Sequence, residues 1–225
     1  MRKRHIPDYL LFAALIVFLG SSALRGEFSE KSMTTAFVPT ASMTSISAEE
    51  VEASQAKYEH LVETLQRNPQ RLAPLPVSTI DSETLWLARA IYSETKRPVE
   101  MELVAWVIRN RVETRYRGRQ TYRDVVLDPF QFSAFNPANG KRWFYANLEP
   151  QTDLGSWQRA LTIAYRVRLA QPEYRPFSIR TRHFYSERSM LGSPHPEWAA
   201  GKRPVIPQRR VTIDERRFRF FEGVS

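Results

Sequence analysis

The chain has 225 residues, enough for one domain of ordinary size together with a targeting segment. It contains no cysteine, which excludes disulfides, thiolate metal sites and cysteine nucleophiles, and its four histidines show no metal-ligand spacing. The net charge of +9 arises wholly within residues 81–225, because residues 1–80 carry equal numbers of acids and bases. A basic domain suits an anionic polymer, such as cell-wall glycan with its peptide carboxylates, nucleic acid or lipid headgroups.

The first 26 residues have the pattern of an export signal. The basic cluster Arg2–Arg4 precedes an apolar run over residues 9–24 and favours an N-terminus that stays in the cytoplasm. Small residues at positions 21–23 offer a cleavage site, whereas an uncut run would anchor the chain in the inner membrane; a buried core helix is a third interpretation. We expect residues 27–225 to be exported, and we leave open whether the signal is cleaved.

Residues 27–79 are predicted to form a linker that contains one acidic helix. Ser47 and Glu50 have the spacing of a capping box, which predicts a helix from there to about Gln66. This helix either packs on the basic domain or stands apart as a spacer. Residues 68–79 contain three prolines and are predicted to be an extended tether. We therefore place the domain boundary before Ile80.

Residues 80–225 are predicted to form a domain with helices first and a small antiparallel sheet last. Apolar periodicity predicts a short helical turn at 122–127 and three longer helices, at 82–93, 98–112 and 154–169. Alternation predicts strands at 179–186, 210–213 and 217–221, the last two paired as a hairpin. This order of elements is typical of an α+β fold.

Glu94 is the candidate for acid–base chemistry. It stands between the first two predicted helices of the domain, at a corner where one carboxylate can be enclosed by Trp86, Ile91, Tyr92 and Trp106. Burial disfavours the anion, and the negative end of the helix dipole acts in the same direction. The cations Lys96 and Arg97 act in the opposite direction, and a surface glutamate paired with either of them is the alternative that the local sequence leaves open.

Four sequence blocks of the predicted domain stand in a distinctive order. They are residues 85–112 (LWLARAIYSETKRPVEMELVAWVIRNRV), residues 130–134 (FQFSA), residues 181–185 (TRHFY) with Pro196-Glu197-Trp198 after them, and the closing hairpin. Together they resemble the SleB/CwlJ-type cell-wall hydrolases over residues 82–222. The resemblance implies a helical, lysozyme-like catalytic domain that cleaves peptidoglycan glycan strands. Family members usually carry a glycine-containing turn after the glutamate, where this chain has Thr95-Lys96-Arg97-Pro98.

The resemblance implies that Glu94 is the catalytic acid. A lytic transglycosylase can work with one carboxylate, because the acid that protonates the glycosidic oxygen can then accept the proton of the attacking C6 hydroxyl. Other glycosidases need a second carboxylate. Asp124 and Asp128, beside the short helix, are interpreted as caps or salt-bridge partners. We therefore expect transglycosylation and leave hydrolysis open; no cofactor and no metal are expected.

Further residues are candidates for holding the glycan: Tyr92, Gln131, Phe132, Ser133, His183, Tyr185 and Trp198. The aromatic side chains, with Phe130, could stack on sugar faces, although core packing is the alternative for each. Gln131 and Ser133 could bind N-acetyl groups or hydroxyls. His183 could equally be a structural histidine, and Asn110 and Arg111 are expected to brace the end of their helix and not to touch substrate.

Two other classes of function stay open on the sequence. The same fold could be a non-catalytic wall-binding or scaffold module with a vestigial Glu94. The domain could also bind another anionic polymer such as nucleic acid, although no nucleic-acid motif is present and the arginines form no clear stripe. We expect peptidoglycan as the partner and no nucleic acid.

Overall fold

A computed structural model describes residues 47–190, 195–209, 213–214 and 216–224. These residues belong to one compact unit that begins at Ser45. Helices precede a small antiparallel sheet, so the fold is α+β, as predicted. The predicted export signal at residues 1–26 lies outside the described residues. Within the described ranges, no helix is long and apolar enough to cross a membrane.

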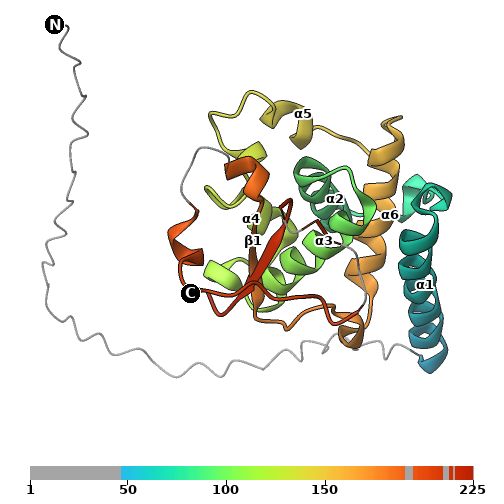
Figure 1. Ribbon diagram of the computed structural model, residues 1–225. Helices are drawn as coiled ribbons and strands as arrows, with labels where there is room; N and C mark the ends of the chain where they lie inside the picture. The colour runs from blue at the N-terminus through green and yellow to red at the C-terminus, as the bar shows by residue number, and fades with distance from the viewer. Residues whose placement is uncertain (1–46, 191–194, 210–212, 215, 225) are drawn as a thin grey trace, which may run out of the picture. The chain divides into compact units, whose positions relative to one another are not determined.

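Helix α1 (Ala48–Arg67) begins at the predicted capping box. The Ser47 Oγ accepts a hydrogen bond from the Glu50 N–H at 3.2 Å, and the Glu50 carboxylate accepts one from the Ser47 N–H at 3.0 Å. The helix packs along α6 and α3 (Figure 1) and buries Tyr58 and two leucines against them. Of the two arrangements left open by the sequence, the structure has the packed one. The compact unit thus begins at Ser45 and not at the expected boundary before Ile80.

The predicted tether lies against the domain and is not wholly extended. It contains two single-turn 3₁₀ helices, η1 (Pro69–Arg71) and η2 (Val77–Thr79). Leu72 packs on the core, and the Thr162 hydroxyl of α6 donates to the Ala73 carbonyl at 3.1 Å. The segment therefore forms part of the path from α1 into the domain.

Three helices form the centre of the domain: α2 (Ser82–Glu94), α3 (Pro98–Glu113) and α6 (Gly155–Leu169). Their bounds lie within a residue of the predicted ones. Helices α2 and α3 both pack on α6, where Trp106 and Trp157 are fully buried. Arg109 joins α3 to α6, because its Nη1 donates to the Val167 and Ala170 carbonyls at 2.7 Å each. Both carbonyls lie at the C-terminal end of α6, where the helix itself leaves carbonyl groups without their usual partners; the Val167 carbonyl also accepts from the Ala170 N–H at 3.3 Å.

Short helices connect these elements. Helix α4 (Tyr122–Leu127) has the predicted bounds and is capped by Thr121, whose hydroxyl oxygen accepts from the Asp124 N–H. Helix α5 (Arg142–Ala146) packs beside α2. The remaining turns are single 3₁₀ turns: η3 (Tyr116–Gly118), η4 (Ser133–Phe135), η5 (Pro172–Tyr174), η6 (Glu187–Met190) and η7 (Glu197–Ala199).

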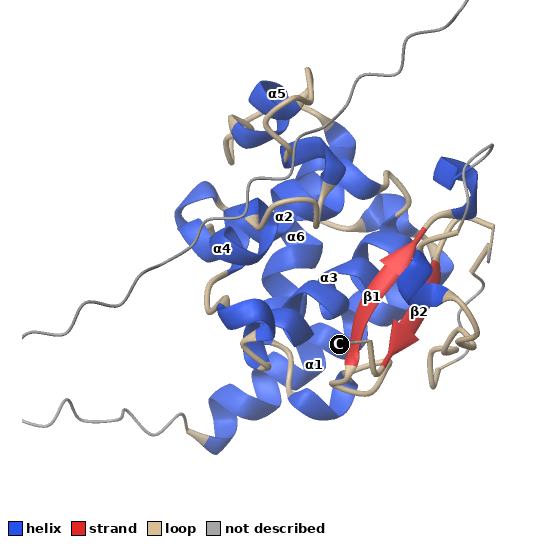
Figure 2. Ribbon diagram, turned by 90° about the vertical axis from the view of Figure 1, so that its left-hand side faces the viewer, coloured by secondary structure: helices blue, strands red, loops and turns tan. Residues whose placement is uncertain are grey.

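The sheet consists of two antiparallel strands, β1 (Thr181–Tyr185) and β2 (Arg219–Glu222). Figure 2 shows them at one side of the helices, beside α3. Val205 adds an isolated bridge to Phe220 of β2. Of the predicted hairpin between 210–213 and 217–221, residues 210–212 lie outside the described residues, so that pairing stays a prediction.

Candidate functional site

Glu94 is the last residue of α2, and hydrogen bonds fix the corner that follows it. The Thr95 hydroxyl donates to the Glu100 carboxylate at 2.6 Å and accepts from the Arg97 N–H at 3.1 Å. Pro98 then opens α3, a position where its fixed φ suits the helix. The corner therefore positions Glu94 without the glycine-containing turn that is usual in the resembling family.

Glu94 lines a cleft of about 490 Å³. The other walls come from α3 with η3, from the segment before η4, and from β1 with the segment after it; they include Arg111, Tyr116, Phe130, Gln131, Ser133, His183, Tyr185 and Trp198. Concave sites of this size bind small ligands or segments of polymers. Among the described residues that line the cleft, Glu94 is the only carboxylate.

Burial raises the pKa of the Glu94 carboxyl to about 7. Loss of water around the carboxylate is the main cause, and it outweighs the cations Arg111 and Lys96, which favour the anion. Near neutral pH the carboxyl is therefore divided between its protonated and ionised forms. That is the condition for a group that must first donate a proton and then accept one.

The two cations that follow Glu94 in the sequence are held elsewhere. The Lys96 ammonium donates to the Tyr92 carbonyl and lies 3.3 Å from the centroid of the Tyr92 ring. Arg97 pairs with Glu100, at 3.6 Å. The described side chains thus do not form the surface ion pair that the local sequence leaves open for Glu94.

Arg111 of α3 lines the cleft and also braces the sheet. Its Nε donates to the Arg182 carbonyl of β1 at 2.6 Å, and its guanidinium carbon lies 5.3 Å from the Phe132 ring centroid. Burial lowers the pKa of Arg111 to about 10, so the side chain remains a cation at neutral pH. Asn110 braces the start of β1 through its bonds to the Ser178 and Thr181 carbonyls.

His183 of β1 pairs with Tyr116 of η3 at the same wall. The Tyr116 hydroxyl lies 3.0 Å from the His183 Nε2, and the two rings meet edge to face. Burial, with the cations Arg111 and Arg182 nearby, lowers the pKa of His183 to about 4. The imidazole is therefore neutral at pH 7, and it can serve as a hydrogen-bonding group but not as a cation.

Phe130 stands at the cleft in a backbone conformation that bulky residues avoid. Its φ is 64°, and the residue is 85% exposed. Asn136 holds the turn by accepting from the Phe130 N–H at 3.1 Å. A strained conformation of this kind costs about 1–3 kcal/mol, and little packing offsets it here. Contact with a ligand explains the position of this ring better than a role in the core.

Tyr185 and Trp198 belong to an aromatic cluster on the sheet side of the cleft. The Tyr185 ring stacks on Phe221, with centroids 5.6 Å apart, and Trp198 meets Tyr185 edge to face at 5.9 Å. Gln131 and Ser133 line the cleft from the segment that contains Phe130. The structure therefore brings six of the predicted site residues together: Glu94, Gln131, Ser133, His183, Tyr185 and Trp198.

Tyr92 and Phe132 do not line the cleft. Tyr92 packs edge to face on Trp157, and Phe132 is buried against Phe184 and Arg111. Trp86, Ile91 and Trp106 are not among the lining residues either, and the expected enclosure of Glu94 by these side chains stays a prediction. Residues two apart on a helix point to different sides, so Tyr92 and Glu94 face different neighbours.

The predictions made from sequence gave no role to Tyr116. Two arginines on either side of it, Arg115 and Arg117, have positive φ values of 49° and 55° and turn the chain back after α3. Glycine or asparagine would mark such a turn in a sequence, and arginine does not. Arg111 could have been selected from the sequence because it lies in the block at residues 85–112, which ends Asn-Arg-Val.

Asp128 is a salt-bridge partner, as predicted. It is buried and accepts from Arg117 at 2.6 Å and from Arg119 at 2.7 Å. Asp124 lies in the first turn of α4. Neither lines the cleft, so they supply no second carboxylate beside Glu94.

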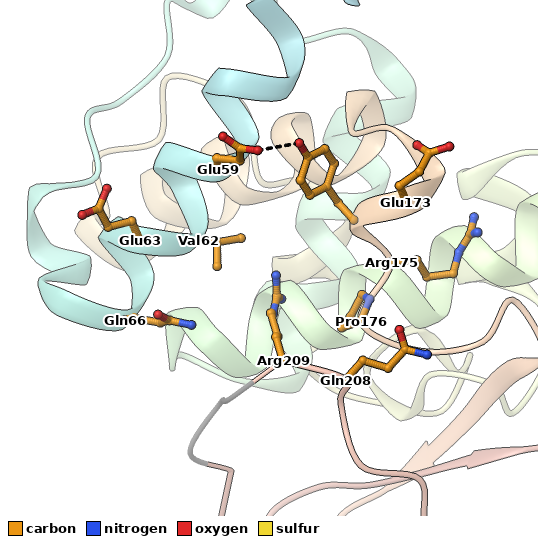
Figure 3. Close-up of a pocket in the computed structure, with 10 residues that line it drawn as sticks. Glu59, Val62, Glu63, Gln66, Glu173, Arg175, Pro176, Gln208 and Arg209 are labelled. Atoms are coloured by element: carbon orange, nitrogen blue, oxygen red, sulfur yellow. Dashed lines mark hydrogen bonds between the residues drawn. The ribbon is translucent and has the colours of Figure 1, made fainter. Parts of the chain in front are cut away.

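A second cavity, of about 390 Å³, lies between α1 and residues 173–176 and 208–209 (Figure 3). Several of its polar groups are used within the protein. Arg175 pairs with Glu113 and Arg209 with Glu102, while Glu59 accepts from the Tyr174 hydroxyl at 2.7 Å. We assign this cavity to the docking of α1. Across the part of the chain that the structure describes, no cluster of three or more potential ligands could hold a metal ion.

Comparison of the chain with protein-family models, with curated proteins and with solved structures found no match.

Proposed function

We propose that this protein is an exported enzyme that cleaves the glycan strands of peptidoglycan, with Glu94 as its single general acid and base. The proposal is carried by the Glu94 carboxyl, which has a pKa of about 7 and lines a cleft with no second carboxylate among the described lining residues. The four sequence blocks supply the substrate class. A lysozyme-like arrangement of the helices around the acid belongs to the same proposal.

The reaction needs one carboxyl group in two protonation states. Protonated Glu94 donates its proton to the glycosidic oxygen, and the bond from C1 to that oxygen breaks with its electron pair on the oxygen. The Glu94 carboxylate then accepts the proton of the sugar's own C6 hydroxyl as that oxygen bonds to C1. The products are a new sugar hydroxyl and a 1,6-anhydro ring, and Glu94 is protonated again.

Hydrolysis would require a second carboxylate at a defined distance. Inverting enzymes place their two carboxyl groups about 6.5–9.5 Å apart, and retaining enzymes about 5–5.5 Å apart. Asp124 and Asp128 are the candidates from the sequence, but neither lines the cleft, and Asp128 pairs with two arginines. The geometry therefore favours attack by the C6 hydroxyl over attack by water.

The proposal predicts that Glu94→Gln in the full-length chain loses muropeptide release from purified sacculi. General acid–base catalysis contributes about 10²–10⁴-fold in rate, so the loss should be at least a hundredfold. Glu52→Gln, which neutralises an exposed carboxylate on α1, is the matched control and should keep wild-type activity. Undiminished release by Glu94→Gln at unchanged thermal stability would refute the assignment.

Mass spectrometry of the released fragments tests the reaction type. Anhydromuramic ends are expected, and no oxygen from labelled water should enter the new sugar terminus. Incorporation of labelled oxygen would show hydrolysis instead. A wild-type protein that binds sacculi and releases nothing would favour the non-catalytic wall-binding module.

A further inference from the structure

Arg111 has hydrogen-bonding capacity that the protein does not use. Its Nε donates to the Arg182 carbonyl, but its Nη1 is buried and has no hydrogen-bond partner among the described residues. A guanidinium carries five N–H donors in a fixed plane, and a buried donor without an acceptor is costly. Arg111 is 4% exposed and lines the cleft, so a ligand in the cleft would meet its side chain there.

The carboxylates nearest to Arg111 do not supply that acceptor. Asp128 is taken by Arg117 and Arg119. Glu94 influences Arg111 electrostatically, but the two side chains form no ion pair within 4.0 Å in the described structure. The guanidinium is also fixed, since its Nε is bound and Phe132 packs against it. Arg111 therefore presents a preorganised cation to the cleft.

A second unpaired group lies in the same wall. His183 is 7% exposed and lines the cleft, and its Nδ1 has no partner among the described residues. Its Nε2 is engaged with the Tyr116 hydroxyl. When that hydroxyl donates to Nε2, the proton of the neutral ring is on Nδ1, which then adds a donor beside the guanidinium.

We propose that Arg111, assisted by His183, binds a carboxylate of the substrate, so that the cleft selects an anionic glycan over a neutral one. The inference rests on the proposed function and deepens it. An arginine fork matches the two oxygens of a carboxylate better than it matches any group of a neutral sugar. On a peptidoglycan strand the carboxylate is either the free lactyl group of a muramic residue or a carboxylate of the peptide attached to that group.

The experiment measures binding of defined tetrasaccharides by calorimetry. Full-length Glu94→Gln prevents turnover and serves as the parent. The ligands alternate N-acetylglucosamine and N-acetylmuramic acid, with the lactyl groups as free acids, as neutral methylamides, or joined to a short peptide that ends in a free carboxylate. The two acidic ligands separate the two sources of the anion, and the methylamide is the neutral reference.

An acidic ligand should bind the parent at least about tenfold more tightly than the methylamide, because a charge-assisted hydrogen bond contributes about that much. Adding Arg111→Gln should abolish this preference, so that the acidic ligands and the methylamide bind with equal affinity. Adding Arg115→Gln, which removes an exposed charge outside the cleft, should preserve it. If Arg111→Gln does not fold, Arg111→Lys keeps the charge without the fork and should reduce the preference several-fold.

Equal binding of acidic and neutral ligands by the parent, or a preference that survives both Arg111 variants, would overturn the inference. Titration with propionate, followed by the His183 imidazole resonances, separates it from the proposed function. Arg111-dependent propionate binding without any glycan binding would mean that the carboxylate site is real and the glycan substrate is wrong. If neither propionate nor glycan binds, the carboxylate site and the proposed function are both rejected.

Discussion

At Glu94, desolvation and two cations act against each other, and desolvation prevails. The sequence places Lys96 and Arg97 two and three positions after Glu94, which suggests that Glu94 is an ionised surface residue. The helix corner changes this, because Arg97 pairs with Glu100 and the Lys96 ammonium is held at the Tyr92 carbonyl. Burial also lowers the pKa of Lys96, to about 8. Lys96 therefore lowers the pKa of the Glu94 carboxyl without forming an ion pair with it among the described residues.

The pH dependence of cleavage follows from this balance. The first step needs protonated Glu94, so activity should fall as the pH rises through about 7. Lys96 favours the Glu94 anion and so lowers the pKa of that carboxyl. Lys96→Met removes this effect, and the alkaline limb of the profile of kcat/KM against pH should therefore move to higher pH.

The measurement is the rate of cleavage of soluble glycan fragments over the range from about pH 5 to about pH 9, which brackets the Glu94 pKa of about 7. Lys57→Met, an exposed lysine on α1 that does not line the cleft, controls for the loss of one charge and should leave the limb in place. A limb that stays fixed, or that moves to lower pH, in Lys96→Met would contradict the assignment of the titrating group.

Among the elements, α1 is joined to the domain by a buried polar network. The Tyr58 hydroxyl donates to Glu102 at 2.6 Å and accepts from the Trp106 Nε1 at 2.6 Å, and Arg209 pairs with Glu102 from the other side. Every member of a buried network must keep its partners, because an unpaired group there is costly. The network therefore makes α1 a structural part of the compact unit.

Tyr58→Phe should destabilise the protein by about 1–3 kcal/mol, the cost of leaving buried polar groups unsatisfied. The Trp106 N–H loses its acceptor and Glu102 loses a donor, while the ring continues to fill its space. Chemical denaturation monitored by circular dichroism measures the change. Tyr165→Phe removes a hydroxyl that has no hydrogen-bond partner among the described residues and should change stability little. Equal stability of the two variants would mean that the network contributes nothing.

The helices could be predicted from sequence because their signals are local. The capping box at Ser47, Pro98 in the first turn of α3 and apolar spacings of three and four place their bounds within a residue or two. The docking of α1 could not be predicted in the same way. Tyr58 and Glu102 meet across more than forty positions, and nothing in either segment names its partner.

The residues of the candidate site divide in the same way, into those that sequence signals identify and those that depend on contacts between distant segments. Glu94 and the residues of the resembling blocks could be named from the sequence, since their order along the chain carries the signal. The roles of Arg111 and Tyr116 in the cleft wall could not, because they depend on how α3 and a turn built from left-handed arginines meet the rest of the cleft. Tyr92 and Phe132 were misplaced because an aromatic side chain suits a core and a sugar site equally well.

For the whole molecule, the net charge overstates the basic surface. Several arginines are used internally: Arg89, Arg109 and Arg111 are buried, and Asp128 offsets one of the two charges of the pair Arg117 and Arg119. The attraction to an anionic wall therefore comes from the remaining exposed cations. Such charges are screened readily by salt.

Binding of the Glu94→Gln protein to isolated sacculi should accordingly weaken as salt rises from about 0.1 M to about 1 M, where the screening length falls from about 10 Å to about 3 Å. A pull-down assay at the two salt concentrations measures the bound fraction. Sacculi with amidated carboxylates are the control and should show weaker, less salt-dependent binding. The same bound fraction at both concentrations would remove electrostatics from the account of wall binding.

Docking of α1 would also limit how far the proposed enzyme could act from a membrane if its predicted apolar run were an anchor. With α1 packed into the compact unit, the segment between the predicted apolar run and the first helix is residues 25–46, which span at most about 75 Å when fully extended. A spacer that reached to residue 79 would allow about 190 Å. An uncleaved anchor would therefore restrict cleavage to glycan strands close to the membrane surface, and the length of that segment would set the depth of wall that the cleft can reach.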